Sequence, residues 1–530
     1  MRSRGRVWVL LAGMLLSAAI WTSSAEAGRI AYVADYDANV VSQLDTETNA
    51  FLSTSFSGMT DTYMLQVSPD GKYLWIPRFT PNKVSVIDLT DGQALPDIDV
   101  NPNPVGVVFS PDSSMAYVLS YDASTVQVFD TATRQQIGDD IPVGAAPYYE
   151  SLSPDGSRLY VANFDDDTIS VINTADRQVV GDPVPVCADL YSMAISPDGT
   201  RLFIGCAGSG DMVMQLSTDT MEATSFSATL PEDPEYLTIS PDGATGWAVI
   251  RTLDEVVSFS TATGAAIGDP IPVGHEPYHL AITPDGSKAF TSNYEGTQGI
   301  TPINIATRVA GTLIPDTGGP WQMAITPDQP PSALIAAPIS IVAGQPAKFD
   351  AVNSIDPDGT ISRYDWNFGD GKSKPDGKVT ESHVFTKAGQ FSVSLTLTDN
   401  EGCSTGFVTT GYTAYCNGGA GASTTLNVKV KAPSNNFSFG RIKLNRKRGT
   451  ASLQVRLPGP GVVMLAGKNV RGARKTVKKA GKSALSVRIT GKAKRALSGR
   501  GVVKVKAKVT YRPKYGKPRT KTRTVTLRRN

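Results

Sequence analysis

A repeat of about 43 residues runs through the first 330 residues of the chain and limits the possible folds more than any other feature. A Ser/Thr-Pro-Asp triplet recurs at intervals of 42, 43, 43, 44, 43 and 43 residues. A fixed period of this size is typical of repeat architectures, in which each repeat forms one supersecondary unit. The triplets begin at Ser68, Ser110, Ser153, Ser196, Ser240, Thr283 and Thr326.

Alternating apolar residues surround each triplet. Gly usually follows the Pro-Asp pair and permits a tight turn. One alternating segment precedes the turn, as at 280–282, a second follows it, as at 159–162, and a third comes after a short polar loop, as at 168–172. This period of two, without a helical stretch, predicts an all-β fold.

The two ends of the repeat region complement each other. Residues 29–56 supply the second to fourth strands of a unit that lacks its first strand, and residues 320–328 supply a first strand alone. Pairing these segments would close a ring and remove two exposed sheet edges. We therefore expect a seven-bladed β-propeller over residues 28–329.

Short motifs inside the repeats resemble a known family. Tyr-Val-Ala-Asn at 160–163, Val-Ile-Asn-Thr at 171–174 and Ser-Pro-Asp-Gly at 196–199 are similar to the YVTN family of β-propeller repeats. The resemblance covers about 300 residues and implies the propeller fold. It implies no particular activity, because one propeller scaffold carries many unrelated functions.

The first 27 residues have the three-part form of a secretory signal peptide. Arg2, Arg4 and Arg6 precede an apolar stretch at 7–20, and small residues at 25–27 suit cleavage. The stretch is short for a membrane span, and a buried N-terminal helix is the alternative. No later stretch reaches transmembrane length, so we expect a secreted protein without a transmembrane anchor, extracellular or associated with the cell wall.

Four cysteines in an exported chain indicate disulfide bonds, and three connectivities are possible. Proximity in the sequence favours Cys187–Cys206 and Cys403–Cys416. Cys187 comes just before a first strand and Cys206 near the end of the adjacent second strand. Antiparallel pairing about the intervening turn would bring these two thiols close together.

Residues 330–431 contain a second set of motifs. Asp-Pro-Asp-Gly at 356–359, Tyr-Asp-Trp-Asn-Phe-Gly-Asp-Gly at 364–371 and an alternating segment at 391–399 closely resemble a PKD domain. The resemblance implies a small Ig-like β-sandwich that acts as a spacer or adhesion module of extracellular and cell-surface proteins. We assign its aspartates to turns rather than to a calcium loop, and we expect the insertion at 401–419 to form a hairpin stapled by the Cys403–Cys416 disulfide.

Charge is strongly separated along the chain. Residues 433–530 contain 29 Lys and Arg and no Asp or Glu, whereas residues 28–432 carry 48 acidic and 19 basic side chains. Alternation at 502–509 predicts half-buried strands, so we expect residues 432–530 to form a basic β-sandwich-like domain. Its Lys504, Lys506 and Lys508 share one strand face, which suits an anionic wall polymer or acidic glycan. Docking on the acidic propeller is the alternative, and specific binding to nucleic acid is not expected.

Catalytic signatures are weak in this sequence. His275-Glu276-Pro277-Tyr278-His279 matches the zinc-protease string H-E-x-x-H, which requires both histidines on one helical turn. The repeat places the string at the start of a strand, where extended backbone would separate the two rings by about 13 Å. The sequence contains no complete phosphate-binding loop. We therefore expect no catalytic residue, no metal site and no cofactor.

One position of the repeat is rich in aromatic residues. Five residues before each Ser/Thr of the triplet lie Tyr63, Val105, Tyr148, Tyr191, Glu235, Tyr278 and Trp321. These positions begin the innermost strand of each blade, near one mouth of the central channel. The functional interpretation is a stacking platform for sugars or an apolar ligand, formed by the five aromatic members. The alternative is packing between blades, because in a regular strand these positions point to the same face as the buried residues just before each triplet.

Together these features favour a secreted or cell-surface binding and scaffold protein rather than an enzyme. The propeller and the PKD-like domain would bind an extracellular protein or carbohydrate, and the basic domain would associate with anionic surface polymers. Two alternatives stay open. The first is a lactonase-like propeller hydrolase, which a panel of lactone substrates would reveal, and the second is a purely structural wall or matrix protein.

Overall fold

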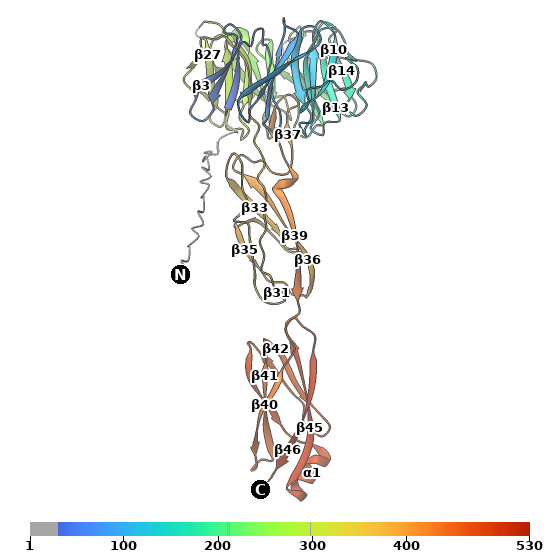
Figure 1. Cartoon of the computed structure of the whole chain (residues 1–530). Helices are drawn as coiled ribbons and strands as arrows, with labels where there is room; N and C mark the ends of the chain where they lie inside the picture. Colours follow the sequence, from blue (N-terminus) through green and yellow to red (C-terminus); the bar gives the residue numbers. More distant parts are fainter. Residues whose placement is uncertain (1–29, 209, 211, 297, 530) are drawn as a thin grey trace, which may run out of the picture.

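A computed structural model describes residues 30–529 except 209, 211 and 297. The expected signal peptide, residues 1–27, lies outside the described residues. The described chain is almost entirely β-structure and forms three units in sequence order: a ring of sheets, a sandwich-like second unit and a third β-rich unit (Figure 1). The ring and the third unit lie at opposite ends of the molecule, with the second unit between them (Figure 1).

The first unit, here called the ring, consists of seven antiparallel sheets over residues 30–325. The inner strands are β4 (Gln66–Val67), β8 (Pro104–Phe109), β12 (Pro147–Leu152), β17 (Leu190–Ile195), β21 (Pro234–Ile239), β25 (Pro277–Ile282) and β30 (Pro320–Ile325). The second strands are β1 (Ile30–Asp35), β5 (Tyr73–Arg78), β9 (Met115–Ser120), β13 (Arg158–Asn163), β18 (Arg201–Cys206), β22 (Thr245–Ile250) and β26 (Lys288–Asn293). The third strands are β2 (Val40–Asp45), β6 (Lys83–Asp88), β10 (Thr125–Asp130), β14 (Thr168–Asn173), β19 (Met212–Ser217), β23 (Glu255–Ser260) and β27 (Gly299–Asn304). The outer strands are β3 (Ala50–Ser57), β7 (Gln93–Asp99), β11 (Ile141–Pro142), β15 (Gln178–Val179), β16 (Val184–Pro185), β20 (Ala223–Thr229), β24 (Ile271–Pro272), β28 (Val309–Ala310) and β29 (Ile314–Pro315).

Neighbouring sheets contact one another in cyclic order, mostly through their inner strands. The cycle is completed where β30 pairs antiparallel with β1, which places Met323 opposite Val33. The last inner strand therefore joins the first three strands in one sheet, as the complementary ends of the repeat region predicted. The arrangement is propeller-like.

The Ser-Pro-Asp triplet forms the turn between the inner and second strands. In the repeat at Ser153, the hydroxyl donates to Asp155 Oδ1 at 2.6 Å and accepts from the Arg158 N–H at 2.9 Å. The hydrogen bond from the Ser153 hydroxyl, together with that from the backbone N–H of Ser157, lowers the pKa of Asp155. The repeated sequence is explained by this turn, because the Ser and the Asp of the triplet satisfy local donors and acceptors.

Both expected disulfides are confirmed. Cys187 is bonded to Cys206 across a Cα–Cα distance of 5.7 Å, and Leu190 lies directly opposite Cys206 in the paired strands. Cys403 is bonded to Cys416 across 5.3 Å.

The second unit has one five-stranded sheet in the order β31-β39-β36-β33-β34 and a β32-β35 pair. Trp366, Phe368 and Phe385 are buried in its core. The strands are β31 (Ile341–Val342), β32 (Ala347–Asp350), β33 (Ile361–Asn367), β34 (Ser373–Gly377), β35 (Thr380–His383), β36 (Gly389–Asp399) and β39 (Ser423–Lys431).

The third unit has a separate core and two sheets, ordered β40-β41-β44 and β43-β42-β45-β46. Its elements are β40 (Ser438–Asn445), β41 (Thr450–Leu457), β42 (Gly461–Ala466), β43 (Ala473–Val477), β44 (Gly481–Val487), α1 (Gly491–Arg500), β45 (Val502–Pro513) and β46 (Arg519–Arg528). Helix α1 was not expected from the sequence. Its buried residues are Ala493 and Leu497, four positions apart, and this pair is too short an apolar pattern to stand out in a basic segment.

A hairpin from the second unit extends into the ring (Figure 1). Strands β37 (Val408–Thr409) and β38 (Ala414–Cys416) form this hairpin, and the insertion was expected to be a disulfide-stapled hairpin. We call residues 407–416 the plug. The sequence did not predict that the plug would dock against the ring.

The plug forms hydrogen bonds with main-chain atoms of inner strands from several sheets. These atoms lie at the end of each strand that precedes the Ser/Thr-Pro-Asp triplet, here called the triplet end. These bonds are Ile195 N–H to Thr410 O at 3.0 Å, Leu152 N–H to Gly411 O at 3.1 Å, Tyr412 O–H to Leu65 O at 3.2 Å and Tyr415 O–H to Ile239 O at 3.0 Å. Inner strands have one edge without a partner strand, and buried backbone groups there need hydrogen bonds. The plug supplies these bonds and occupies this end of the channel.

Ring closure predicts a large difference between two truncations. Deleting residues 30–48 removes β1 and β2 and leaves β30 without its partner. We expect this protein to aggregate or to melt at least about 10 °C below the intact chain. Deleting residues 433–529 should leave the melting of the ring unchanged. Equal thermal midpoints for the two truncations, measured by calorimetry, would show that the ring does not depend on the shared sheet.

The plug offers a matched pair of glycine substitutions. Gly411 has a φ of +93°, and a Cβ there would overlap the Ser151 hydroxyl of the ring. A methyl group at Gly406, in the same insertion, would meet no described atom within 4 Å. Gly411→Ala should cost roughly 1–3 kcal/mol and release the plug, whereas Gly406→Ala should be neutral. Limited proteolysis should then cut residues 405–417 faster in Gly411→Ala alone; equal cleavage of both variants would disprove the docking.

Candidate functional site

A β-bulge occurs at the start of the inner strands, at the end of the channel opposite the plug. In β12, Pro147 pairs with Asn163 and Tyr149 with Ala162, so Tyr148 is left without a partner residue. A bulge of this kind redirects a side chain away from the regular alternation. The register leaves the equivalent residue unpaired in five other sheets, at Val105, Tyr191, Glu235, Tyr278 and Trp321. Because the bulge shifts the register at these positions, regular strand alternation does not decide between packing and ligand binding there.

A second set of residues completes the mouth and was missed by the sequence reasoning. Its members directly follow the second strands and are Tyr36, Phe79, Tyr121, Phe164, Ala207, Arg251 and Tyr294. They recur with the same period of about 43 residues as the triplet, which is the signal that could have revealed them.

One side of the mouth is closed by aromatic packing. The rings of Tyr278 and Trp321 stack with centroids 4.1 Å apart, and Tyr63 meets Trp321 edge-on at 5.6 Å. Tyr36 and Tyr294 also contact Trp321, at 5.7 and 5.2 Å. For Tyr278 and Trp321, packing is therefore the main role.

The other side of the mouth is hollow. A cavity of about 380 Å³, here called the cup, is lined by Tyr63, Phe79, Val105, Tyr121, Tyr148, Phe164, Tyr191 and Glu235. Three of the five aromatic residues proposed from the sequence thus line one cavity, and Tyr278 and Trp321 lie beside it. Most of these rings are half-buried, so part of each remains open to a ligand.

Glu235 brings a carboxyl group to the edge of the aromatic cup. Its side chain is only 21% exposed, and this burial raises its pKa to about 7 although Arg251 acts in the opposite direction. Arg251 lies 3.8 Å from the Glu235 carboxylate and 3.3 Å from that of Glu276, and its guanidinium covers the Tyr278 ring at 4.8 Å.

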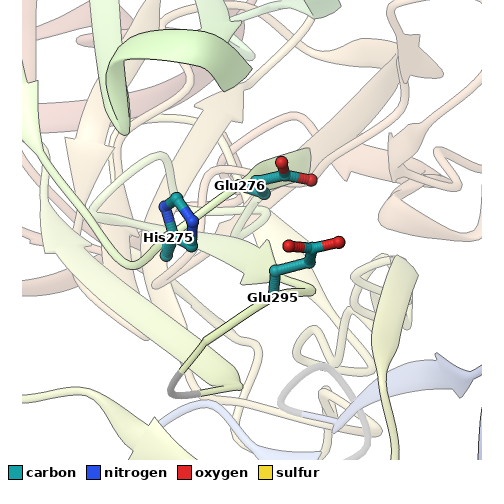
Figure 2. Close-up of side chains that lie close together, drawn as sticks. All are labelled: His275, Glu276 and Glu295. Carbon is teal, nitrogen blue, oxygen red and sulfur yellow. The ribbon is translucent and has the colours of Figure 1, made fainter.

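The H-E-x-x-H string forms no zinc site of the protease type. Residues Pro277–Ile282 are the extended strand β25; His279 is buried in the channel, and burial lowers its pKa to about 3. His275 is exposed and lies with Glu276 and Glu295 on neighbouring loops, where the three can place ligand atoms within 4.8 Å (Figure 2). Two of these groups already have partners, since His275 Nδ1 lies 3.0 Å from Asp254 and Glu276 pairs with Arg251.

The cup has a floor as well as walls. Behind the bulged residues, Tyr149 and Tyr236 lie 6.4 Å apart, and Tyr236 contacts His279 at 4.0 Å. The Tyr412 hydroxyl of the plug accepts a hydrogen bond from Gln322 at 3.3 Å. Aromatic side chains and the plug therefore fill the channel below the cup, which opens toward the mouth.

A cluster of carboxylates lies where the ring meets the second unit. Asp328 follows the last repeat, and Asp358 and Asp399 come from the second unit; their exposures are 1%, 2% and 2%. Neither carboxylate oxygen of Asp328 has a hydrogen-bond donor among the described residues, and the same holds for Oδ2 of Asp399 and Oδ1 of Asp358. Asp356 and Glu401 complete the cluster, because their charges act on Asp358.

This cluster suits a hard divalent cation. Burial, followed by the charge of Asp399, raises the pKa of Asp328 to about 10, and burial raises that of Asp358 to about 7. Calcium prefers several carboxylate oxygens, and Asp328, Asp358 and Asp399 could supply them. The sequence assigned the aspartates of the second unit to turns, and Asp399 does hold one through the N–H groups that follow it. The contribution of Asp328 from the repeat region was not foreseen.

Comparisons with known proteins identify the second unit. Residues 328–414 match the family model of the PKD domain. Over 72 residues, or 14% of the chain, the sequence is 40% identical to Collagenase ColA of Clostridium perfringens (strain 13 / Type A) and 40% identical to Microbial collagenase of Vibrio alginolyticus. The match spans only 6% and 9% of the length of these two proteins.

Solved structures resemble the chain more broadly but at low identity. Hydrazine synthase of Kuenenia stuttgartiensis is 20% identical with a TM-score of 0.46, covering 51% of this chain and 90% of that one. A functionally unknown protein from Desulfotomaculum acetoxidans DSM 771 is 15% identical with a TM-score of 0.49, covering 56% and 98%. Among the residues that the structure describes, no helix is long and apolar enough to cross a membrane.

The carboxylate cluster predicts opposite pH behaviour with and without calcium. Since Asp328 and Asp358 have raised pKa values in the folded state, that state binds more protons than the unfolded one above about pH 4, and stability falls as the pH rises. In chelator, the PKD domain should therefore melt at a lower temperature at pH 8 than at pH 5. Millimolar calcium should raise the midpoint at pH 8 by about 5 °C and reduce this dependence.

Two variants separate the cluster from general charge effects. Asp328→Asn should melt higher than the wild type in chelator and lose the response to calcium. Asp376→Asn changes an exposed carboxylate of the same domain and should behave like the wild type. A calcium response that survives Asp328→Asn would assign the cation to another place.

Proposed function

We propose that the chain is an exported, non-enzymatic binding protein that links two surfaces. A seven-bladed β-propeller of residues 28–329 presents the cup to an extracellular protein or glycan. The PKD domain within residues 330–431 is a spacer, and residues 432–530 hold the protein on an anionic surface polymer.

An extracellular setting is supported by two features. The PKD domain and the two disulfides fit an extracellular protein. The partial match to two proteins named collagenases extends over only 72 residues, so it supports a domain-mediated binding role rather than their activity.

The observation that carries the proposal is a row of cations on the third unit. In β45, Lys504, Lys506 and Lys508 are exposed while the residues between them are buried. Their Cα atoms face Thr526, Thr524 and Thr522 of β46, so no acidic side chain lies across the strand pair. Successive cations on such a strand are spaced by roughly 7 Å, which suits the repeating charges of a polyanion.

The position of the third unit also supports an external partner. It lies at the end of the molecule away from the ring (Figure 1). Residues 433–530 contain no carboxylate, so their 29 Lys and Arg side chains repel one another unless an anion screens them. Docking of the third unit on the acidic ring of the same molecule would require a sharp fold-back between the units.

The row of cations predicts a charge-specific loss of binding. Changing Lys504, Lys506 and Lys508 to Gln should weaken the retention of the full chain on purified anionic wall polymer by about tenfold at low salt, and wild-type retention should fall steeply as salt increases. The matched control changes Lys492, Lys494 and Arg495 of α1 to Gln, which removes the same charge from an exposed helix. Cosedimentation measures the retention. Equal losses in both triple variants, or binding of residues 433–530 to the ring alone, would contradict the proposal.

A further inference from the structure

The chemistry of the cup is specific enough to suggest a ligand class. Six of the eight lining side chains are Tyr or Phe, and Glu235 is the carboxyl group among them. Aromatic faces attract cations, and cages of aromatic rings recognise quaternary ammonium groups. We propose that the cup binds an organic ammonium group, with Glu235 as its counter-charge. This inference rests on the proposed function, since it names the ligand chemistry of the same mouth.

The angles between the lining rings favour a compact, rounded group over a flat sugar. Phe164 meets Tyr191 at an interplanar angle of 88°, and Tyr121 meets Tyr148 at 84°. Rings set nearly at right angles form the walls of a cage, whereas stacking on a sugar requires an open flat face. The cavity of about 380 Å³ is also far larger than a metal ion.

The mouth already binds one cation by the same chemistry. The Arg251 guanidinium lies 4.8 Å from the centre of the Tyr278 ring, between the carboxylates of Glu235 and Glu276. One guanidinium can balance only one of these two carboxylates. A negative charge therefore remains at the edge of the cup for a second cation.

Carboxylates on other loops make the surroundings of the cup negative. Asp189 and Asp233, together with Glu235, raise the pKa of Tyr191 beyond the effect of burial. On the opposite side, Asp165 and Asp122 act in the same direction on Tyr121. This field favours an approaching cation and repels an anion.

The protonation of Glu235 links binding to pH. The groups that act on its carboxyl are Asp233, Arg251 and Glu276. The charge of Glu235 in turn acts on Tyr148, Tyr149, Tyr191 and Tyr278 of other inner strands. Because the pKa of Glu235 is about 7, most of the population is neutral at pH 6 and most is charged at pH 8. Affinity for a cation should therefore rise with pH over this range. His275, which contacts Asp254, also titrates nearby. It loses its positive charge as the pH rises, so its titration also favours cation binding at higher pH.

The test compares choline with its uncharged isostere 3,3-dimethylbutan-1-ol by titration calorimetry on the full chain. At pH 8 we expect choline to bind at least about tenfold more tightly than the isostere. At pH 6 choline should bind more weakly than at pH 8. Glu235→Gln should lower the affinity for choline about tenfold and remove most of the pH dependence, and Tyr191→Leu should lower it about fivefold. The control Glu295→Gln removes an exposed carboxylate outside the cup and should bind as the wild type does.

Two outcomes would overturn the inference. The first is that the wild-type chain binds choline and the isostere with equal affinity, or does not bind choline at all. This comparison uses the wild-type chain alone, so it does not depend on whether any variant folds. The second is binding that Glu235→Gln and Tyr191→Leu leave unchanged while both retain the wild-type melting temperature. A peptide with trimethyllysine forms a second arm: tighter binding than choline identifies a polypeptide source of the ammonium group, and equal binding identifies a small molecule. Retention on anionic polymer does not involve the cup, so it can persist when the inference fails.

Discussion

The antiparallel pairing of β30 with β1 is the interaction on which the rest of the ring depends. It joins segments far apart in the chain, since the Ile30 N–H meets the Thr326 hydroxyl across a separation of 296 residues. Without this pairing, the array would have two free sheet edges and no central channel. Closure also brings the bulged residues around one mouth and the triplet ends of the inner strands around the other, so both the cup and the seat of the plug follow from it.

The plug gives the two ends of the channel different roles. At the triplet end, the carbonyl oxygens of Thr410 and Gly411 accept hydrogen bonds from main-chain N–H groups of the inner strands, and the Tyr415 hydroxyl donates to a main-chain oxygen; these bonds attach the PKD domain to the ring. The other end of the ring, which carries the cup, faces away from the PKD domain and the basic unit (Figure 1). A ligand in the cup and a polymer on the basic unit could then be bound together without competing for space.

The sequence was sufficient for features that follow directly from the repeat. The incomplete units at the two ends of the repeat region predicted the closing pair of strands, and antiparallel pairing about the intervening turn predicted that Cys187 and Cys206 lie close together. It was insufficient where one unit meets another. Tyr412 contacts Leu65 across 347 positions, a pairing that forms only when the units dock. Bulges such as that at Tyr148 could not be predicted from the sequence either, because an extra residue is defined only relative to the partner strand.

The central claim is that the open mouth of the ring is the ligand site of an extracellular binding protein. Photoaffinity labelling of the full chain with a trimethylammonium diazirine, followed by peptide mapping, tests this claim directly. The account predicts labels concentrated in residues 60–66, 118–124, 145–151 and 188–194, which contain cup residues, and suppression of these labels by excess choline. Labels concentrated in the plug or in residues 433–529, or labels that choline does not displace, would contradict it.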